Sequence, residues 1–110
     1  MKTYTHQWFD HKSVYACSEK GMWKLNIYDG ESVAELYDFI VFPEFRGQGL
    51  GNEFLDEAIR TAREEGCKVI VLWPDCAPWV ERWYRRKGFA PDARYCNYDG
   101  NPGYSLEIKC

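Results

Sequence analysis

The feature that most constrains this fold is a glycine-rich turn, Arg46-Gly47-Gln48-Gly49-Leu50-Gly51, between an apolar segment and an amphipathic one. Residues 39–43, before the turn, are β-prone and end at a proline. After it, apolar residues recur at helical spacing: Leu50, Phe54, Leu55, Ala58, Ile59 and Ala62. A glycine turn that opens a helix presents unpaired backbone N–H groups and the positive end of the helix dipole. The pattern therefore predicts a strand, an anion-binding turn and a helix, with Arg46 adding a charge-assisted contact.

Two widespread phosphate-binding motifs do not fit this turn. The dinucleotide-binding motif requires glycine at its first, third and sixth places, but counting from Gly47 the sixth place holds Asn52. The P-loop ends in Gly-Lys-Ser or Gly-Lys-Thr, and no such triplet follows here. The remaining pattern, Arg46-x-x-Gly49-x-Gly51, resembles the turn with which the GNAT N-acetyltransferase superfamily binds the pyrophosphate of acetyl-coenzyme A.

A second motif extends this resemblance. Tyr84, followed by a three-residue spacer and Gly88-Phe89, is similar to the family's tyrosine and Gly-Phe pair. Between the motifs, an amphipathic segment, Gly66 and the apolar residues 69–73 follow in the family's order, so the resemblance covers residues 33–89. It implies one short GNAT-like α/β domain over residues 1–110, with a mixed, mostly antiparallel sheet and two main helices.

The composition limits the classes of protein to consider. With 110 residues, 45% of them hydrophobic, the chain is long enough for one domain and too apolar for disorder. A net charge of -3 and the lack of a long basic tract disfavour nucleic acid and anionic membranes as partners.

No apolar run approaches the roughly 18 residues of a membrane helix, and no signal-peptide pattern is present, so we expect a cytoplasmic protein. The five cysteines show no C-x-x-C spacing, which indicates reduced thiols and no metal site: Cys17, Cys67, Cys76, Cys96 and Cys110.

Alternation and turn residues predict the remaining elements. We expect strands over residues 4–9, 13–18, 22–28, 33–42 and 68–73, and a final hairpin of strands 93–98 and 104–109 around residues 99–103. Helices are expected over residues 49–65 and from a start in Asp75-Cys76-Ala77-Pro78 to a glycine stop at Gly88.

The N-terminal part is short compared with the family that the chain resembles, whose members usually carry two helices after the first strand. Only about twenty residues precede the turn Glu19-Lys20-Gly21, so we expect this helix pair to be absent and the acceptor side of the site to be open. An open site favours a bulky acceptor, such as a lysine of a protein. The alternative is a homodimer in which a second subunit rebuilds the missing wall.

The resemblance also implies where the cosubstrate acetyl-coenzyme A binds. Its pantetheine arm would lie between the strands at residues 33–42 and 68–73, along Phe39-Ile40-Val41, with backbone contacts from Phe39 and Val41. Its pyrophosphate would lie on Arg46, Gly47, Gln48, Gly49, Leu50 and Gly51. One position departs from the family pattern, because Ala77 stands where many members have an asparagine that contacts the arm.

Two residues are candidates for catalysis. Glu35 matches the position of the base in some family members, and its even spacing from Val41 predicts that both side chains share one face. Asp38 is an alternative base that odd spacing aims at the opposite face, while an exposed carboxylate without a catalytic role is an equal alternative for Glu35. The resemblance places Tyr84 beside the thioester sulfur as proton donor to the leaving thiolate. Its alternative role is that of a core aromatic paired with Val80.

These observations favour an enzyme that transfers acetyl from acetyl-coenzyme A directly to a primary amine, with a protein lysine as a candidate acceptor. No cysteine is placed by the motif as an acyl carrier, so a covalent intermediate is not expected. The alternative from another class is a non-catalytic GNAT-fold module that binds coenzyme A or a protein partner. A nucleic-acid contact through the basic second helix is a minor alternative.

Overall fold

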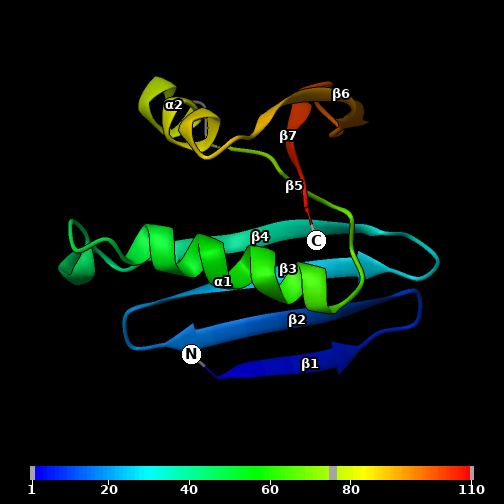
Figure 1. Cartoon of the computed structure of the whole chain (residues 1–110), viewed down its shortest axis with the longest axis horizontal. Helices are drawn as coiled ribbons and strands as arrows, with labels where there is room; N and C mark the ends of the chain where they lie inside the picture. The colour runs from blue at the N-terminus through cyan, green and yellow to red at the C-terminus, as the bar shows by residue number, and fades with distance from the viewer. Residues whose placement is uncertain (1, 75–76, 110) are drawn as a thin grey trace.

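The computed structural model describes residues 2–74 and 77–109, which form seven strands, one 3₁₀ turn and two α-helices (Figure 1). In chain order these are β1 (Thr3–Gln7), β2 (His11–Ser18), β3 (Gly21–Tyr28), β4 (Val33–Val41), the 3₁₀ turn η1 (Pro43–Phe45), α1 (Leu50–Glu64), β5 (Val69–Leu72), α2 (Pro78–Arg86), β6 (Ala90–Cys96) and β7 (Pro102–Glu107). The strands form one sheet in the order β1-β2-β3-β4-β5-β7-β6, and among these pairs only β4 and β5 run parallel. The predicted mixed, mostly antiparallel sheet with two helices is confirmed.

The last hairpin differs from its predicted bounds. The structure begins β6 at Ala90 and β7 at Pro102, so both strands start earlier than the sequence indicates. The turn closes early because the Asn97 side-chain oxygen accepts hydrogen bonds from the backbone N–H groups of Asp99 and Asn101, both at 3.0 Å. The predicted start of the second helix included Asp75 and Cys76, which lie outside the described residues.

No helix separates the first two strands. Residues 8–10 connect β1 directly to β2, and the two strands pair antiparallel from Thr3 with Ala16 to Gln7 with Lys12. The expected absence of a helix pair after the first strand is therefore confirmed.

The core lies on one face of the sheet. Alternate residues of β3 point to that face and are almost fully buried, as a half-covered strand requires. The apolar stripe of α1 packs on them, and α2 contributes Tyr84 to the same cluster. The buried side chains that form this layer include Trp23, Leu25, Ile27, Phe54, Leu55, Ala58, Ala62, Tyr84 and Phe89. Both helices thus cover the same face, and the opposite face carries no helix of the described chain.

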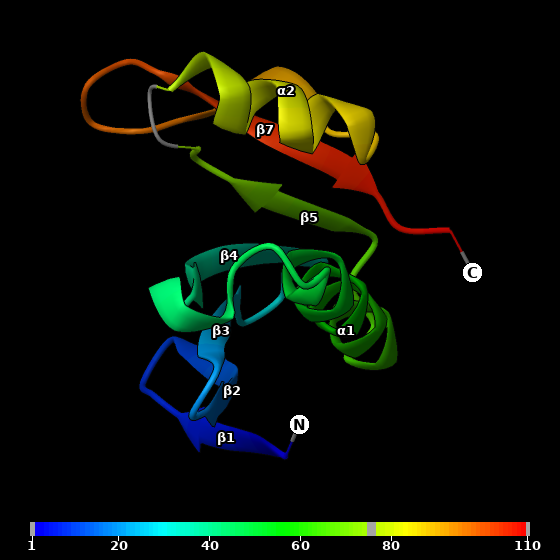
Figure 2. The same cartoon turned by 90° about the vertical axis from the view of Figure 1, so that its left-hand side faces the viewer.

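The sheet opens between its two central strands. Strands β4 and β5 pair only over Val33–Glu35 with Val69–Val71, and no pairing continues toward the ends that lead to η1 and α2. Figure 1 shows β1 to β4 running across the view while β7 runs down it, and Figure 2 shows β5 and β7 running across the view. This strong twist separates the carboxyl ends of β4 and β5, and α1 and α2 lie on the two sides of the resulting gap.

A β-bulge interrupts β4. Lys24 pairs with Tyr37 and Met22 pairs with Ile40, so one residue of β3 between these pairs faces two residues of β4. Asp38 takes the extra position with a φ of 53°, the left-handed conformation, which aspartate tolerates better than most residues. The bulge shifts the inward and outward alternation of every later residue of the strand.

The bulge overturns two predictions about faces. Glu35 and Val41 lie on opposite faces, since Glu35 pairs with Asn26 on the uncovered face while Val41 packs against the core. The expectation that odd spacing turns Asp38 away from Glu35 is also wrong. The Asp38 carboxylate lies 3.4 Å from the Lys24 ammonium, on the uncovered side.

Candidate functional site

A cavity of about 1090 Å³ occupies the gap between β4 and β5 and extends to the glycine turn and α2. Eight of the nine residues predicted to bind the cosubstrate line it, namely Phe39, Ile40, Val41, Arg46, Gly47, Gly49, Leu50 and Gly51. Tyr84 lines it as well. Gln48 and Glu35 are not among its lining residues. The fold therefore brings both sequence motifs to one cavity, although Gly51 and Tyr84 are 33 positions apart in the chain.

The glycine turn leaves its backbone donors accessible. Gly47 and Gly49 have positive φ values, 82° and 79°, and a Cβ atom at either position would meet nothing within 4 Å. Gly49 is the N-cap residue of α1, and no side chain caps the helix start. The first N–H groups of a helix have no partner within the helix. The turn thus presents uncompensated donors to the cavity, together with the positive end of the dipole of a 15-residue helix.

Arg46 holds the entry to this turn. Its Nε atom donates a hydrogen bond to the backbone carbonyl of Val41 at 2.9 Å, which links the end of β4 to the turn. This contact fixes the direction of the side chain, and Arg46 itself lines the cavity. The guanidinium carries five donors, so a phosphate can be bound by the remaining ones.

Tyr84 lies both in the core and at the cavity. Its side chain is 8% exposed and is a member of the core cluster. Its ring makes edge contacts with Trp83 and Phe89, with centroid distances of 5.0 and 5.7 Å, and lies 6.4 Å from that of Phe39. The same side chain borders the cavity next to the β4 backbone. Packing therefore holds the ring in one place beside the gap between the strands.

Glu35 lies on the uncovered face, half-buried. Burial raises the pKa of its carboxyl above the ordinary value of 4.5, and the charge of Glu31 acts in the same direction. A hydrogen bond that the Tyr37 hydroxyl donates to Glu35 Oε1 at 3.0 Å lowers the pKa, as does the charge of His11, but burial is the largest effect. A carboxyl with a raised pKa is a stronger base than an ordinary surface carboxylate.

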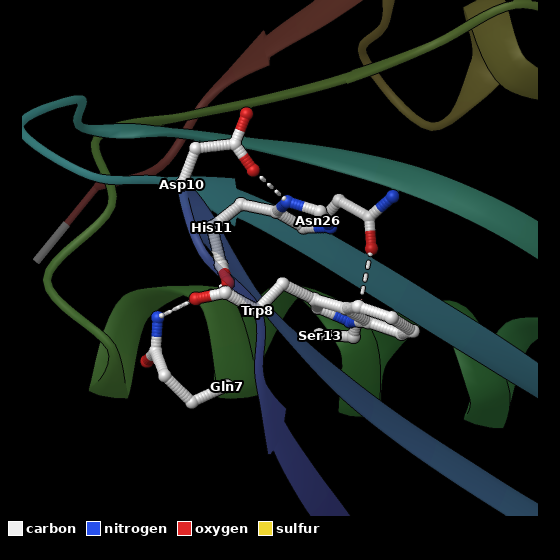
Figure 3. Close-up of polar contacts among 6 residues, drawn as sticks. All are labelled: Gln7, Trp8, Asp10, His11, Ser13 and Asn26. Carbon is white, nitrogen blue, oxygen red and sulfur yellow. Dashed lines mark hydrogen bonds and ion pairs between the residues drawn. The ribbon is translucent and has the colours of Figure 1, made fainter.

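An ordered set of polar contacts lies on the same face of the sheet (Figure 3). The Trp8 indole N–H donates to the Ser13 hydroxyl at 3.1 Å, and Ser13 donates to the side-chain oxygen of Asn26 at 2.8 Å. Asn26 lies directly across from Glu35 in the sheet. Asn26, the neighbour of Glu35, is therefore held by Ser13 of β2, which itself binds Trp8 in the turn between β1 and β2.

Tyr37 is a site residue that the sequence analysis missed. It lines the cavity, its hydroxyl binds Glu35, and its ring stacks on that of Trp73 with a centroid distance of 6.3 Å. Burial and the nearby Glu35 carboxylate raise the pKa of the phenol. The available signal was its spacing, because residues two apart on a strand share a face.

Neither a metal cluster nor a transmembrane helix is found in the residues that the structure describes. Over residues 2–74 and 77–109 there is no group of three or more histidine, cysteine, aspartate or glutamate side chains placed to hold a metal ion. No helix in those ranges is long and apolar enough to cross a membrane. The described cysteines Cys17, Cys67 and Cys96 are free thiols, whereas Cys76 and Cys110 lie outside the described residues.

Comparisons with known proteins all point to acetyltransferases. The model of the acetyltransferase (GNAT) family matches residues 2–89. An uncharacterized N-acetyltransferase of Methanocaldococcus jannaschii is 35% identical over 68 residues, which are 61% of this chain and 30% of that protein. A probable glucosamine 6-phosphate N-acetyltransferase of Oryza sativa is 33% identical over 54% of this chain and 35% of that protein. A histone acetyltransferase of Glycine max is 36% identical over 54% of this chain and 25% of that protein. The matches thus span between a quarter and about a third of these curated relatives.

Solved structures share the fold over most of the chain. A putative GNAT acetyltransferase of Desulfovibrio desulfuricans superposes with a TM-score of 0.71 at 21% identity, over 91% of this chain and 71% of that one. An N-acetyltransferase of Thermoplasma acidophilum, solved in complex with coenzyme A, has a TM-score of 0.68 at 19% identity, over 89% of this chain and 61% of that one. The similarity of fold therefore extends beyond the segment of sequence similarity.

Proposed function

This chain belongs to the acetyltransferase (GNAT) family, and on that premise we propose that it transfers an acetyl group from acetyl-coenzyme A directly to a primary amine. One observation carries the proposal. The uncapped glycine turn, the splayed ends of β4 and β5 and the Tyr84 side chain border a single cavity. A phosphate-bearing thioester requires a turn that binds its phosphates and a proton donor for its leaving sulfur, and here both border one gap.

The residues present fit this cosubstrate. Open space above Gly47 and Gly49 leaves the N–H groups of the turn free to bind a pyrophosphate, with Arg46 as the cationic contact. The β4 backbone over residues 39–41 lacks a β5 partner, so its polar groups are available to the pantetheine amides. When bound, acetyl-coenzyme A supplies an activated acyl group and a thiolate leaving group.

The roles of the side chains follow from their surroundings. We assign proton removal from the acceptor to Glu35, because an ammonium has no lone pair and this carboxyl has a raised pKa. We assign proton donation to the leaving sulfur to Tyr84, whose ring packing holds it beside the cavity. The β4 backbone near Val41 would polarise the thioester carbonyl.

The acceptor that we favour is a lysine of a protein. Supporting this is the uncovered face around Glu35, over which no helix of the described residues lies, so that a bulky acceptor can approach. The relatives' names include both a sugar-phosphate acetyltransferase and a histone acetyltransferase, so a small amine remains the competing acceptor in the assay.

The first test is thermal unfolding with and without acetyl-coenzyme A, comparing Gly49→Glu with Gly30→Glu. Both glycines have a φ of 79° and open space for a side chain, so the two substitutions impose the same backbone strain. Only Gly49 lies at the cavity, whereas Gly30 is in the β3–β4 turn. At a concentration about 100 times the dissociation constant, the ligand should stabilise wild type and Gly30→Glu by about 2.7 kcal/mol, or roughly 10 °C or more, and leave Gly49→Glu unchanged. An equal shift in Gly49→Glu would exclude the turn as the binding site.

Release of free thiol in the same samples separates an enzyme from a binding module. With a lysine-containing peptide or spermidine as acceptor, wild type should release coenzyme A. Tyr84→Phe should release it more slowly while keeping the thermal shift. Binding without release for any acceptor would favour the non-catalytic module.

A further inference from the structure

The candidate base and the cavity are joined by one side chain. Glu35 does not line the cavity, whereas Tyr37 does. The Tyr37 hydroxyl donates a hydrogen bond to Glu35 Oε1 at 3.0 Å. An acceptor nitrogen in the cavity would therefore meet the phenol of Tyr37 before it met the carboxylate.

The position of this hydroxyl is fixed from both sides. The Tyr37 ring stacks on Trp73 across the gap between β4 and β5, with an angle of 18° between the ring planes. In the sheet, Tyr37 pairs with Lys24, whose ammonium binds the Asp38 carboxylate. The lysine charge is thus engaged with Asp38, and the phenol of Tyr37 is directed along the strand to Glu35.

We propose that Tyr37 is a proton relay, passing the proton of the acceptor ammonium from the cavity to Glu35. This inference rests on the proposed function. The ammonium N–H bond breaks as its proton moves to the Tyr37 oxygen, while the Tyr37 O–H bond breaks as its own proton moves to Glu35 Oε1. The amine gains a free lone pair, Tyr37 is neutral before and after, and Glu35 ends as a carboxylic acid.

Tyr37 is better suited to act as a proton relay than as the base itself. Burial and the Glu35 carboxylate raise the pKa of Tyr37, so the tyrosinate is not populated at neutral pH. A phenol that gives one proton while taking another never has to carry the charge.

Several charged or titratable groups face this pair and belong to the same pH response. They come from β2, β3, the turn before β4, and β4 itself: His11, Lys24, Tyr28, Glu31 and Asp38. Tyr28 serves as the matched control. It also faces the Glu35 charge and its pKa is raised by burial, but it neither binds Glu35 in the described structure nor lines the cavity.

The test compares Tyr37→Phe, Tyr28→Phe, Glu35→Gln and the double variant of Tyr37 and Glu35. Activity is measured as thiol release from acetyl-coenzyme A with a lysine-containing peptide and with spermidine. Tyr37→Phe keeps the ring on Trp73 and should lower kcat by about tenfold or more, with KM for acetyl-coenzyme A unchanged. Tyr28→Phe should retain wild-type kcat. In the Glu35→Gln background, Tyr37→Phe should cause no further loss, because the relay has lost its destination.

The pH response gives a readout that a purely structural role would not move. Because the hydrogen bond from Tyr37 lowers the pKa of Glu35, its removal should shift the acidic limb of the rate profile to higher pH. A carbon-13 titration of the Glu35 carboxyl without any acceptor should show the same upward shift. Two results would overturn the relay but not the proposed function. One is a Tyr37→Phe variant with wild-type kcat and an unshifted acidic limb of the rate profile. The other is a double variant whose kcat falls below that of Glu35→Gln by the full factor seen in Tyr37→Phe alone. Absence of turnover by wild type with either acceptor would overturn the proposed function and the relay with it.

Discussion

At the scale of single residues, the ionised form of Glu35 is the form that can act as a base and also the form that destabilises the fold. Its folded-state pKa is raised, chiefly by burial, so the folded state holds the proton more tightly than the unfolded chain does. The tighter proton binding by Glu35 stabilises the fold fully below the pKa of the unfolded chain, about 4.5. This contribution is lost as the pH rises through the pKa of the folded state. At neutral pH the half-buried carboxylate therefore destabilises the fold, while its ionised form is the one that accepts a proton.

Glu35→Gln should consequently lose activity and gain stability at pH 7. The amide removes the ionised group but can still accept the hydrogen bond from Tyr37. We expect the midpoint of thermal unfolding to rise by a few degrees at about pH 7 and to match that of wild type near pH 4. Scanning calorimetry at the two pH values measures this. A Gln variant less stable than wild type at pH 7 would contradict the assigned cause of the shift.

At the scale of elements, the bulge in β4 determines what the strand presents to each side. Before it, Glu35 and Tyr37 face the uncovered side; after it, Phe39 and Val41 face the helices. One strand thereby supplies a carboxylate to one face and an apolar border of the cavity to the other. The left-handed Asp38 makes this change of side possible.

Asp38→Val should destabilise the protein by about 1 to 2 kcal/mol, because a β-branched residue does not tolerate left-handed backbone. Asp38→Asn is the matched control, since it also removes the charge that pairs with Lys24 but tolerates this conformation. The exposed ion pair contributes little, so Asp38→Asn should remain close to wild type. Urea unfolding of the three proteins measures the difference. Equal losses in both variants would indicate that the ion pair, and not the backbone, matters.

At the scale of the whole molecule, two packed halves meet along a short parallel seam. Strands β1 to β4 with α1 form one half, and β5 to β7 with α2 form the other, as Figure 2 illustrates. The seam between β4 and β5 holds only three paired residues on each strand, while the cavity lies where the pairing stops. A ligand in this gap would contact elements of both halves.

Acetyl-coenzyme A should therefore slow amide hydrogen exchange in residues 39–41, the first turn of α1 and α2, on both sides of the cavity. The β1–β2 hairpin has no residue at the cavity and should exchange at the same rate with and without ligand. Exchange followed by mass spectrometry tests this directly. Protection confined to the glycine turn would mean that only the pyrophosphate is bound and the gap is not used.

Much of this protein was determined by local sequence. The positive φ values at positions 47 and 49 favour glycine. The helical spacing of apolar residues determines α1, and their alternation determines β3. Each of these features depends only on residues close together in the chain. The anion-binding turn and the family resemblance could be read from these local patterns. Tyr84 became a candidate through the resemblance, and tertiary packing places its ring in the core and at the border of the cavity.

Only the tertiary structure decided which way β4 faces. Its bulge comes from the register between β3 and β4, and counting residues along one strand cannot reveal a shift relative to its neighbour. For that reason counting along the strand wrongly placed Glu35 and Val41 on one face. The gap between β4 and β5, too, arises from the twist of a whole sheet. Local rules determined which residues this chain uses, and long-range strand register determined which of them meet.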